Sequence, residues 1–129
     1  MYKLKTSISV STALLIFIVM SAFQVANPDA IVGTWKEKDG TKTIEIYKVN
    51  TSYFGKITEN LSEKENKIKP GTVIMKDFVY EDDKWKGTID IPSRDLSLKG
   101  KITLEGPNEI KSVATVAFVG KSKSWTRVE

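Results

Sequence analysis

The chain of 129 residues contains no cysteine and no histidine. Without cysteine it can form no disulfide bond, carry no lipid on an N-terminal cysteine and use no thiol nucleophile. Without histidine it also lacks the side chain that most often moves protons near neutral pH, and both residues are the commonest zinc ligands. We therefore expect no metal site, no cofactor and no catalytic residue, and any stability must come from packing and barrel closure.

Long hydrophobic runs are also scarce, and the one that occurs is Ala13–Met20. Lys3 and Lys5 precede it, small and polar residues follow it, and no acidic residue occurs before Asp29. This order is typical of a secretory signal peptide, and the run is shorter than the roughly 20 residues of a membrane span. We predict a signal peptide over residues 1–26 and a periplasmic or secreted protein, with an uncleaved membrane anchor as the alternative.

The excess of positive charge is small. Removal of Lys3 and Lys5 with the predicted signal peptide lowers the net charge from +4 to +2. A charge of this size does not indicate a nucleic-acid partner. Residues 27–129 are enough for a single domain with a modest core.

Beyond Pro28, apolar and polar residues alternate in short runs that turn residues separate, and no helical period is present. The alternation predicts eight strands: Ile31–Glu37, Thr43–Val49, Ser52–Thr58, Thr72–Tyr80, Lys84–Ile91, Asp95–Leu104, Glu109–Phe118 and Ser122–Val128. Many short strands with tight turns are typical of a sandwich or an up-and-down barrel. On the sixth predicted strand, for example, one face carries Leu96, Leu98, Gly100, Ile102 and Leu104.

One segment, Glu59–Gly71, is charged and lacks alternation. It predicts either a short helix or a long loop at one rim of the sheet, which could serve as a functional lid or simply be mobile.

A glycine lies beside an aromatic residue on the same face of three predicted strands. The pairs are Gly33-x-Trp35, Tyr53-x-Gly55 and Trp85-x-Gly87. Glycine inside a strand permits strong local bending, and a neighbouring ring can cover the space it leaves. We interpret the three pairs as structural.

Four short motifs, in this order, resemble the DUF2147 family of small exported bacterial proteins of unknown function. They are Ile31–Trp35 (IVGTW), Tyr53–Ile57 (YFGKI), Trp85–Ile89 (WKGTI) and Trp125–Val128 (WTRV). The resemblance covers nearly the whole chain after the predicted signal peptide and implies a small, eight-stranded antiparallel barrel of lipocalin-like fold. It also implies that Arg127 packs against Trp35, so that Gly33, Trp35 and Arg127 form a structural clasp.

Among the carboxylates, Asp77 is the unusual one because it shares a strand face with Met75 and Val79. It either points inward with a raised pKa, as a hydrolytic acid would, or lies at a bulge and faces water. The acidic cluster at residues 81–83 is more typical of a solvated hairpin than of a calcium site.

An eight-stranded barrel holds one small ligand at most. Since several aromatic side chains must share its interior, we expect a shallow cleft at the rim near residues 59–71 rather than a deep cavity. The candidate ligand-binding residues are Tyr53, Asp77, Trp85 and Trp125. The predicted function is non-enzymatic binding of a small, partly apolar molecule, or of an envelope protein, with a fully packed interaction module as the alternative and a hydrolase third.

Overall fold

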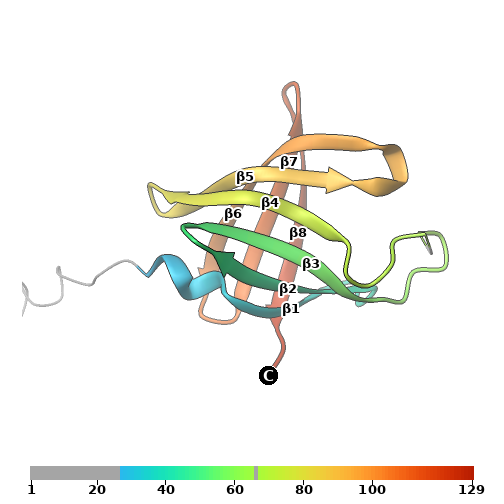
Figure 1. Ribbon diagram of the computed structural model, residues 1–129, viewed down its shortest axis with the longest axis horizontal. Coiled ribbons are helices and arrows are strands. Elements are labelled where there is room, and N and C mark those ends of the chain that lie inside the picture. The colour runs from blue at the N-terminus through green and yellow to red at the C-terminus, as the bar shows by residue number, and fades with distance from the viewer. Residues whose placement is uncertain (1–26, 66) are drawn as a thin grey trace, which may run out of the picture.

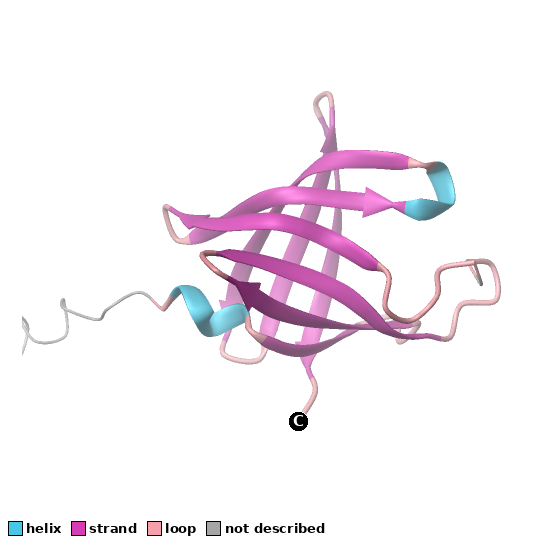
Figure 2. Ribbon diagram, viewed as in Figure 1, coloured by secondary structure: helices cyan, strands magenta, loops and turns pink. Residues whose placement is uncertain are grey.

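The structure, a computed structural model, describes residues 27–65 and 67–129, so the predicted signal peptide lies outside the described residues. The chain forms a closed barrel of eight antiparallel strands in sequence order (Figure 1). The strands are β1 (Gly33–Glu37), β2 (Lys42–Val49), β3 (Ser52–Asn60), β4 (Val73–Glu81), β5 (Lys84–Ile91), β6 (Leu96–Gly106), β7 (Glu109–Val116) and β8 (Val119–Arg127). Two single-turn 3₁₀ helices, η1 (Pro28–Ile31) and η2 (Pro92–Arg94), lie at opposite ends of the barrel (Figure 2).

The predicted barrel is confirmed, and the sandwich alternative is wrong, because β8 pairs with β1. Trp35 lies opposite Arg127 in this pairing, and Glu37 lies opposite Trp125. Every strand thus has two hydrogen-bonded neighbours, and the sheet has no free edge. Among the described residues, no helix is both long and apolar enough to cross a membrane.

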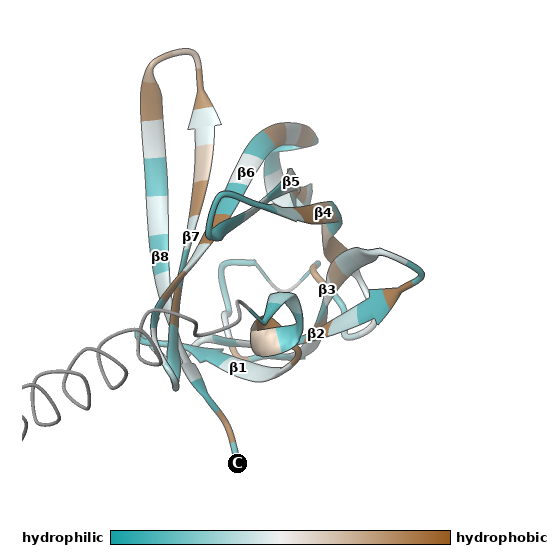
Figure 3. Ribbon diagram, turned by 90° about the vertical axis from the view of Figure 1, so that its left-hand side faces the viewer, coloured by the Kyte–Doolittle hydropathy of each residue, from teal (hydrophilic) through white to brown (hydrophobic). Residues whose placement is uncertain are grey.

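Helix η1 fills one end of the barrel, which we call the closed end (Figure 3). Ile31 is fully buried there. The indole Nε1 of Trp35 donates to the Ile31 carbonyl at 2.9 Å, and that of Trp85 donates to the Pro28 carbonyl at 2.9 Å. The hydroxyl of Tyr53 donates to the Asp29 carboxylate. Three aromatic side chains therefore hold a segment that precedes the first strand.

Arg127 joins η1 to the two strands that close the barrel. Its guanidinium carbon lies 4.3 Å from the centre of the Trp35 ring. Nη2 donates to the Ala30 carbonyl at 2.7 Å and Nη1 donates to the Val32 carbonyl at 3.1 Å. Gly33 leaves room for this arrangement, since a Cβ there would lie 2.6 Å from Nη1, and its φ of +144° strains other residues. The implied packing of Arg127 on Trp35 is confirmed.

Strand β4 departs from simple alternation at a bulge. The register with β5 shifts between Lys76 and Val79, and Asp77 adopts a left-handed φ of +55°. The bulge turns Phe78 into the core with no exposed surface, while Asp77 and Val79 face solvent. Of the two alternatives for Asp77, the bulge that faces water is confirmed and the inward acid is wrong, because the extra residue changes the parity of the strand.

Phe78 lies over two glycines that face each other on neighbouring strands, Gly87 of β5 and Gly100 of β6. A Cβ on Gly87 would lie 2.7 Å from the Phe78 ring, and one on Gly100 would lie 2.9 Å from it. The expectation that a glycine makes space for a ring is correct here. The ring, however, comes from β4 and not from Trp85 on the same strand.

The last hairpin turns earlier than the sequence predicts. Its two turn residues are Ala117 and Phe118, and Gly120 pairs with Thr115 inside the ladder. Strand β8 therefore begins at Val119 rather than Ser122. The error arose because a Gly-Lys pair is a stronger turn signal than Ala-Phe.

The segment between β3 and β4 contains turns and bends but no helix among its described residues. The Asn60 side chain donates to the carbonyls of Glu65 and Ile68, at 2.8 and 2.9 Å. These bonds fold the segment against the barrel and bury Ile68. Of the two predicted conformations, the loop is the observed one.

We predict that Arg127→Ala lowers the free energy of unfolding by about 1–3 kcal/mol, because it removes the cation–π contact and the hydrogen bonds to Ala30 of η1 and to Val32 directly after it. Urea denaturation measures the change. Arg94→Ala, which removes an exposed arginine from η2, is the control and should leave stability unchanged. Equal stability of the two variants would contradict the clasp.

We also predict an acid-dependent effect of Asp29→Asn. The hydrogen bond from Tyr53 and the ion pair with Lys48 hold the pKa of Asp29 below its usual value. A lowered pKa contributes stability above the ordinary carboxyl pKa, and this contribution is lost as the pH falls through the folded-state value. At pH 7 the variant should melt a few degrees below wild type.

The difference in Tm should start to shrink as the pH falls below the ordinary carboxyl pKa of about 4, and should be lost below the lower pKa of folded Asp29. Thermal scans at several pH values follow both proteins. A difference that stays constant from neutral to acid pH would show that charge on Asp29 does not hold η1.

Candidate functional site

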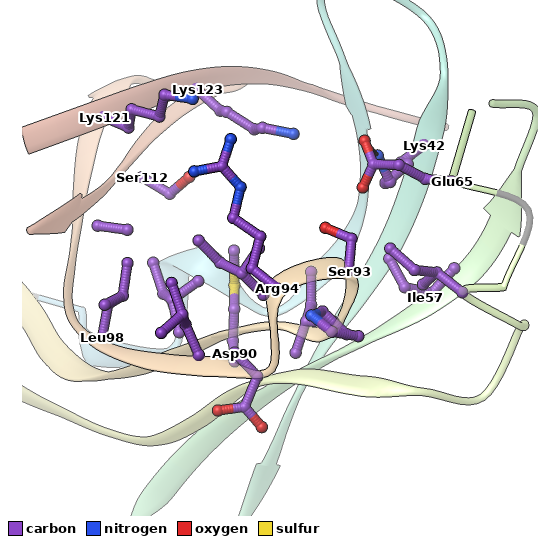
Figure 4. A pocket seen from close by; sticks show the side chains of 18 of the residues that line it. Lys42, Ile57, Glu65, Asp90, Ser93, Arg94, Leu98, Ser112, Lys121 and Lys123 are labelled. Atoms are coloured by element: carbon purple, nitrogen blue, oxygen red, sulfur yellow. Dashed lines mark hydrogen bonds and ion pairs between the residues drawn. The ribbon is translucent and has the colours of Figure 1, made fainter.

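A cavity of about 420 Å³ opens at the end of the barrel opposite η1, which we call the open end (Figure 4). Apolar side chains from β3 to β8, from η2 and from the β3–β4 loop line most of it. They are Ile57, Ile68, Ile74, Met75, Ile89, Ile91, Pro92, Leu96, Leu98, Ala114, Val116, Val119 and Trp125. The volume falls within the range of about 300–1,000 Å³ that is usual for small-molecule sites.

The cavity is deeper than the shallow rim cleft that the sequence predicts. It reaches Met75 and Trp125, both of which are only 2% exposed. The Nε1 of Trp125 donates to the Ser112 hydroxyl at 2.9 Å, so the indole's polar atom is satisfied within the cavity wall. The interior is therefore packed in its closed half and open in the other half.

A buried carboxylate lies in the wall of the cavity at the end of β1. The Glu37 side chain is 2% exposed, and its Oε1 accepts from Lys123 Nζ at 2.8 Å. Its Oε2 accepts from the Thr41 hydroxyl at 2.7 Å. Both carboxylate oxygens are thus paired, as a buried charge requires.

A second ion pair lies where β2 begins. Lys42 is 6% exposed, and its Nζ lies 3.1 Å from Glu65 Oε1. Glu65 belongs to the β3–β4 loop that Asn60 holds in place, and Figure 4 shows the pair on one side of the opening. The expected location near residues 59–71 is therefore correct, since Glu65 and Ile68 both line the cavity.

Two further cations, Arg94 of η2 and Lys121 of β8, line the opening without an ion pair to any residue in the described ranges. Figure 4 shows Arg94 extending across the opening, toward the side on which Lys121 and Lys123 lie. Four cations of the lining, Lys42, Arg94, Lys121 and Lys123, thus accompany two inward carboxylates, Glu37 and Glu65. The opening carries two uncompensated positive charges.

Asp90 borders the cavity but does not reduce this charge. Its carboxylate points away from the opening and pairs with Lys76 Nζ at 2.7 Å (Figure 4). It also accepts from the Ser97 hydroxyl at 2.7 Å. Both contacts hold the pKa of Asp90 below its usual range, so it is a charged and satisfied group of the outer surface.

Of the four predicted ligand-binding residues, the structure places only Trp125 in the cavity. Tyr53 and Trp85 lie in the closed half, where they bind η1. Burial, together with the hydrogen bond to Asp29, raises the pKa of Tyr53 to about 12, so it stays neutral near pH 7. Asp77 is exposed at its bulge, which removes it from the candidates as an inward acid.

Within residues 27–65 and 67–129, no group of three or more His, Cys, Asp or Glu side chains is placed to hold a metal ion. The carboxylates that line the cavity are each engaged with a lysine. What the arrangement offers chemically is an apolar interior beneath a cationic opening.

Sequence reasoning missed the buried polar residues of the cavity, Glu37, Lys42 and Ser112. The alternation of inward and outward residues along β1 and β2 could have identified Glu37 and Lys42. Glu37 follows Gly33 and Trp35 on the inward face, and Lys42 precedes Ile44 and Ile46 on theirs. A charged residue at an inward position near a strand end indicates the lining of an opening.

A closed eight-stranded barrel with one end plugged and a cavity at the other defines a lipocalin-like protein. The chain belongs to the DUF2147 family, described as "Uncharacterized protein conserved in bacteria", whose model matches residues 33–127. No curated protein matches the chain.

Two solved structures share the fold. Protein HP1028 from Helicobacter pylori, described as belonging to the lipocalin family, superposes with a TM-score of 0.62 at 12% identity, over 82% of this chain and 85% of that one. A redesigned β-barrel gives a TM-score of 0.53 at 18% identity, over 78% of this chain and 94% of the other. At such identities the likeness concerns the fold alone.

The Glu37–Lys123 pair supports a prediction on stability. Lys123→Met leaves the Glu37 carboxylate buried with only Thr41 as a partner, and should cost about 1–3 kcal/mol. Lys121→Met, two residues away on the same face of β8, removes a lysine without an ion pair and is the matched control.

Urea denaturation at pH 7 compares the two variants. The double variant Glu37→Gln with Lys123→Met should recover most of the loss, because the buried charge is then gone. A Lys123→Met protein as stable as Lys121→Met would contradict the assigned pair.

Proposed function

We propose that this barrel is an exported, non-enzymatic binding protein for an anionic amphiphile, a small molecule with an apolar body and one carboxylate, phosphate or sulfate group. The observation that carries the proposal is the pair of uncompensated cations, Arg94 and Lys121, at the opening of a mainly apolar cavity. The proposal narrows the predicted small, partly apolar ligand to one with a negative head.

The walls supply the affinity for the apolar body. Burial of each methylene group contributes roughly 0.8 kcal/mol, and the branched aliphatic side chains that surround the cavity present no polar atoms to it. Met75 and Trp125 at its inner end suit an adaptable fit, because a thioether and an indole ring both accept varied apolar shapes. The apolar body therefore points inward.

The opening supplies the selectivity for charge. A guanidinium group can bind a carboxylate or a phosphate through two parallel hydrogen bonds, and Lys121 adds a second cation on the facing wall. Lys42 and Lys123 are already neutralised by their carboxylate partners. An anionic head at the opening would therefore balance Arg94 and Lys121.

The two other predicted functions have less support. A pure interaction module would have no need of an open half, whereas the barrel leaves about 420 Å³ unfilled. A hydrolase would need an inward acid beside a second carboxylate, and Asp77, the residue considered for this role, is exposed.

Titration with dodecanoate, followed by tryptophan fluorescence and by calorimetry, tests the proposal. The variant with both Arg94→Gln and Lys121→Gln should bind dodecanoate about tenfold or more weakly, because it loses two charge-assisted contacts. Its affinity for neutral dodecanol should not change. The matched control is the variant with Lys101→Gln and Lys111→Gln, two exposed lysines on the outer face of β6 and β7.

A second variant tests the location of the apolar body. Ala114→Trp places a large ring in the cavity and should abolish binding of both dodecanoate and dodecanol, with little loss of stability, since open space receives the ring. The proposal is wrong if dodecanoate does not bind to the wild type. It is also wrong if the loss of both cations leaves its affinity unchanged.

A further inference from the structure

The hairpin of β7 and β8 extends beyond the rest of the barrel and ends in an apolar tip (Figure 3). We define the hairpin tip as residues 116–119, Val-Ala-Phe-Val. Phe118 is fully exposed, Val119 is 72% exposed and Val116 is 53% exposed. No other turn among the described residues presents an aromatic side chain in this way. A large ring in full contact with water is a feature that folding alone does not explain.

The requirements of the turn do not explain these residues either. Ala117 adopts a left-handed φ of +52° at the first turn position. Two-residue hairpin turns strongly favour glycine, asparagine or aspartate where φ is positive, and this chain uses Asn50, Asp82 and Asp83 at its other left-handed hairpin positions. At the hairpin tip the chain instead has Ala117 at the left-handed position, followed by a second apolar residue, Phe118. The apolar character is thus independent of the local backbone.

The hairpin itself carries charges of one sign only, since it contains no aspartate or glutamate from Ile110 to Arg127. Lys121 follows the tip on β8, and Arg94 extends toward the same wall (Figure 4). Lys123, farther from the tip, is paired with Glu37. The exposed apolar apex is therefore bordered by cations.

We propose that the hairpin tip docks the barrel on the surface of an anionic lipid bilayer, with Phe118 and Val119 among the acyl chains and the nearby cations at the headgroups. An apolar apex bordered by lysine and arginine is the arrangement that interfacial membrane binding uses. The apex is a narrow two-residue turn, which inserts into a fluid layer more readily than it fills a protein groove. The charge complementarity favours an anionic membrane over a second copy of this chain, which carries the same cations.

Docking would also bring the cavity to the bilayer. Val116 and Val119 line the cavity as well as forming the tip, so the opening lies beside the inserted residues. An amphiphile could then pass between the lipid layer and the cavity without crossing water. This consequence rests on the proposed function, whereas the docking itself does not.

Co-sedimentation with vesicles tests the docking. The protein used lacks the predicted signal peptide, since residues 27–129 contain all eight strands of the barrel. Wild type should bind vesicles that contain phosphatidylglycerol, should bind pure phosphatidylcholine vesicles far more weakly, and should be released by added salt. Phe118→Ser should weaken the binding about tenfold. The matched control is Val49→Ser, because Val49 is 47% exposed beside the β2–β3 turn at the closed end.

The outcomes separate the two proposals. Phe118 does not line the cavity, so Phe118→Ser should keep the wild-type affinity for dodecanoate in the absence of vesicles. If wild type does not bind vesicles, or binds them no better than Phe118→Ser, the docking proposal is wrong and the cavity proposal is unaffected. If wild type binds vesicles but not dodecanoate, the cavity proposal is wrong and the docking proposal is unaffected.

Sedimentation velocity tests whether the hairpin tip instead binds a second copy of the chain. Wild type should remain monomeric without vesicles. A dimer that Phe118→Ser dissociates would assign the tip to a second copy of the chain and would overturn the docking on lipid.

Discussion

The contact of Arg127 with Trp35 and with the carbonyls of η1 is the interaction on which the rest of the structure depends. The guanidinium group of this β8 residue donates to carbonyls at the end of η1 and covers the indole of Trp35 on β1. It therefore joins the helix that fills the closed end to the pairing of β1 with β8, the seam of the barrel. With the closed end fixed in this way, Tyr53 and Trp85 are used for structure. The opposite end is thereby free to hold a cavity.

The two halves of the barrel differ in what fills them. In the closed half, aromatic side chains, among them Phe78, fill the space, and their buried polar atoms are hydrogen-bonded. In the open half, the wall contains ion pairs with one buried partner, such as Glu37 with the half-exposed Lys123. Burial of a charge, even a paired one, rarely stabilises a fold more than apolar residues would, so the pair favours a role in shaping the charge of the opening. The contacts that close the barrel and the proposed binding site thus lie at separate ends.

The sequence predicts the general form of the fold and little of the site. Period-two alternation gave eight strands, and the family resemblance placed Arg127 on Trp35, because both depend on patterns that a linear chain displays. The bulge at Asp77 was one of two alternatives, because an acid on an apolar face suggests a change of register. The turn at Ala117–Phe118 was not foreseen, since Ala117 is left-handed in a context where tertiary packing overrides local preference. The location of the cavity near residues 59–71 was predicted, but its depth was not, because depth depends on the space between side chains.

Every strand pair except one joins neighbours in the chain, and this has a consequence for the order of folding. Hairpins such as β2–β3 close small loops, whereas the contact between Ala30 and Arg127 joins residues 97 positions apart. Local pairs form early because they lose less chain entropy, so the seam between β1 and β8 closes last. Until that step the cavity has no complete wall. A ligand of the proposed kind would therefore recognise only the finished barrel, and its binding would slow the reopening of the seam that closes last.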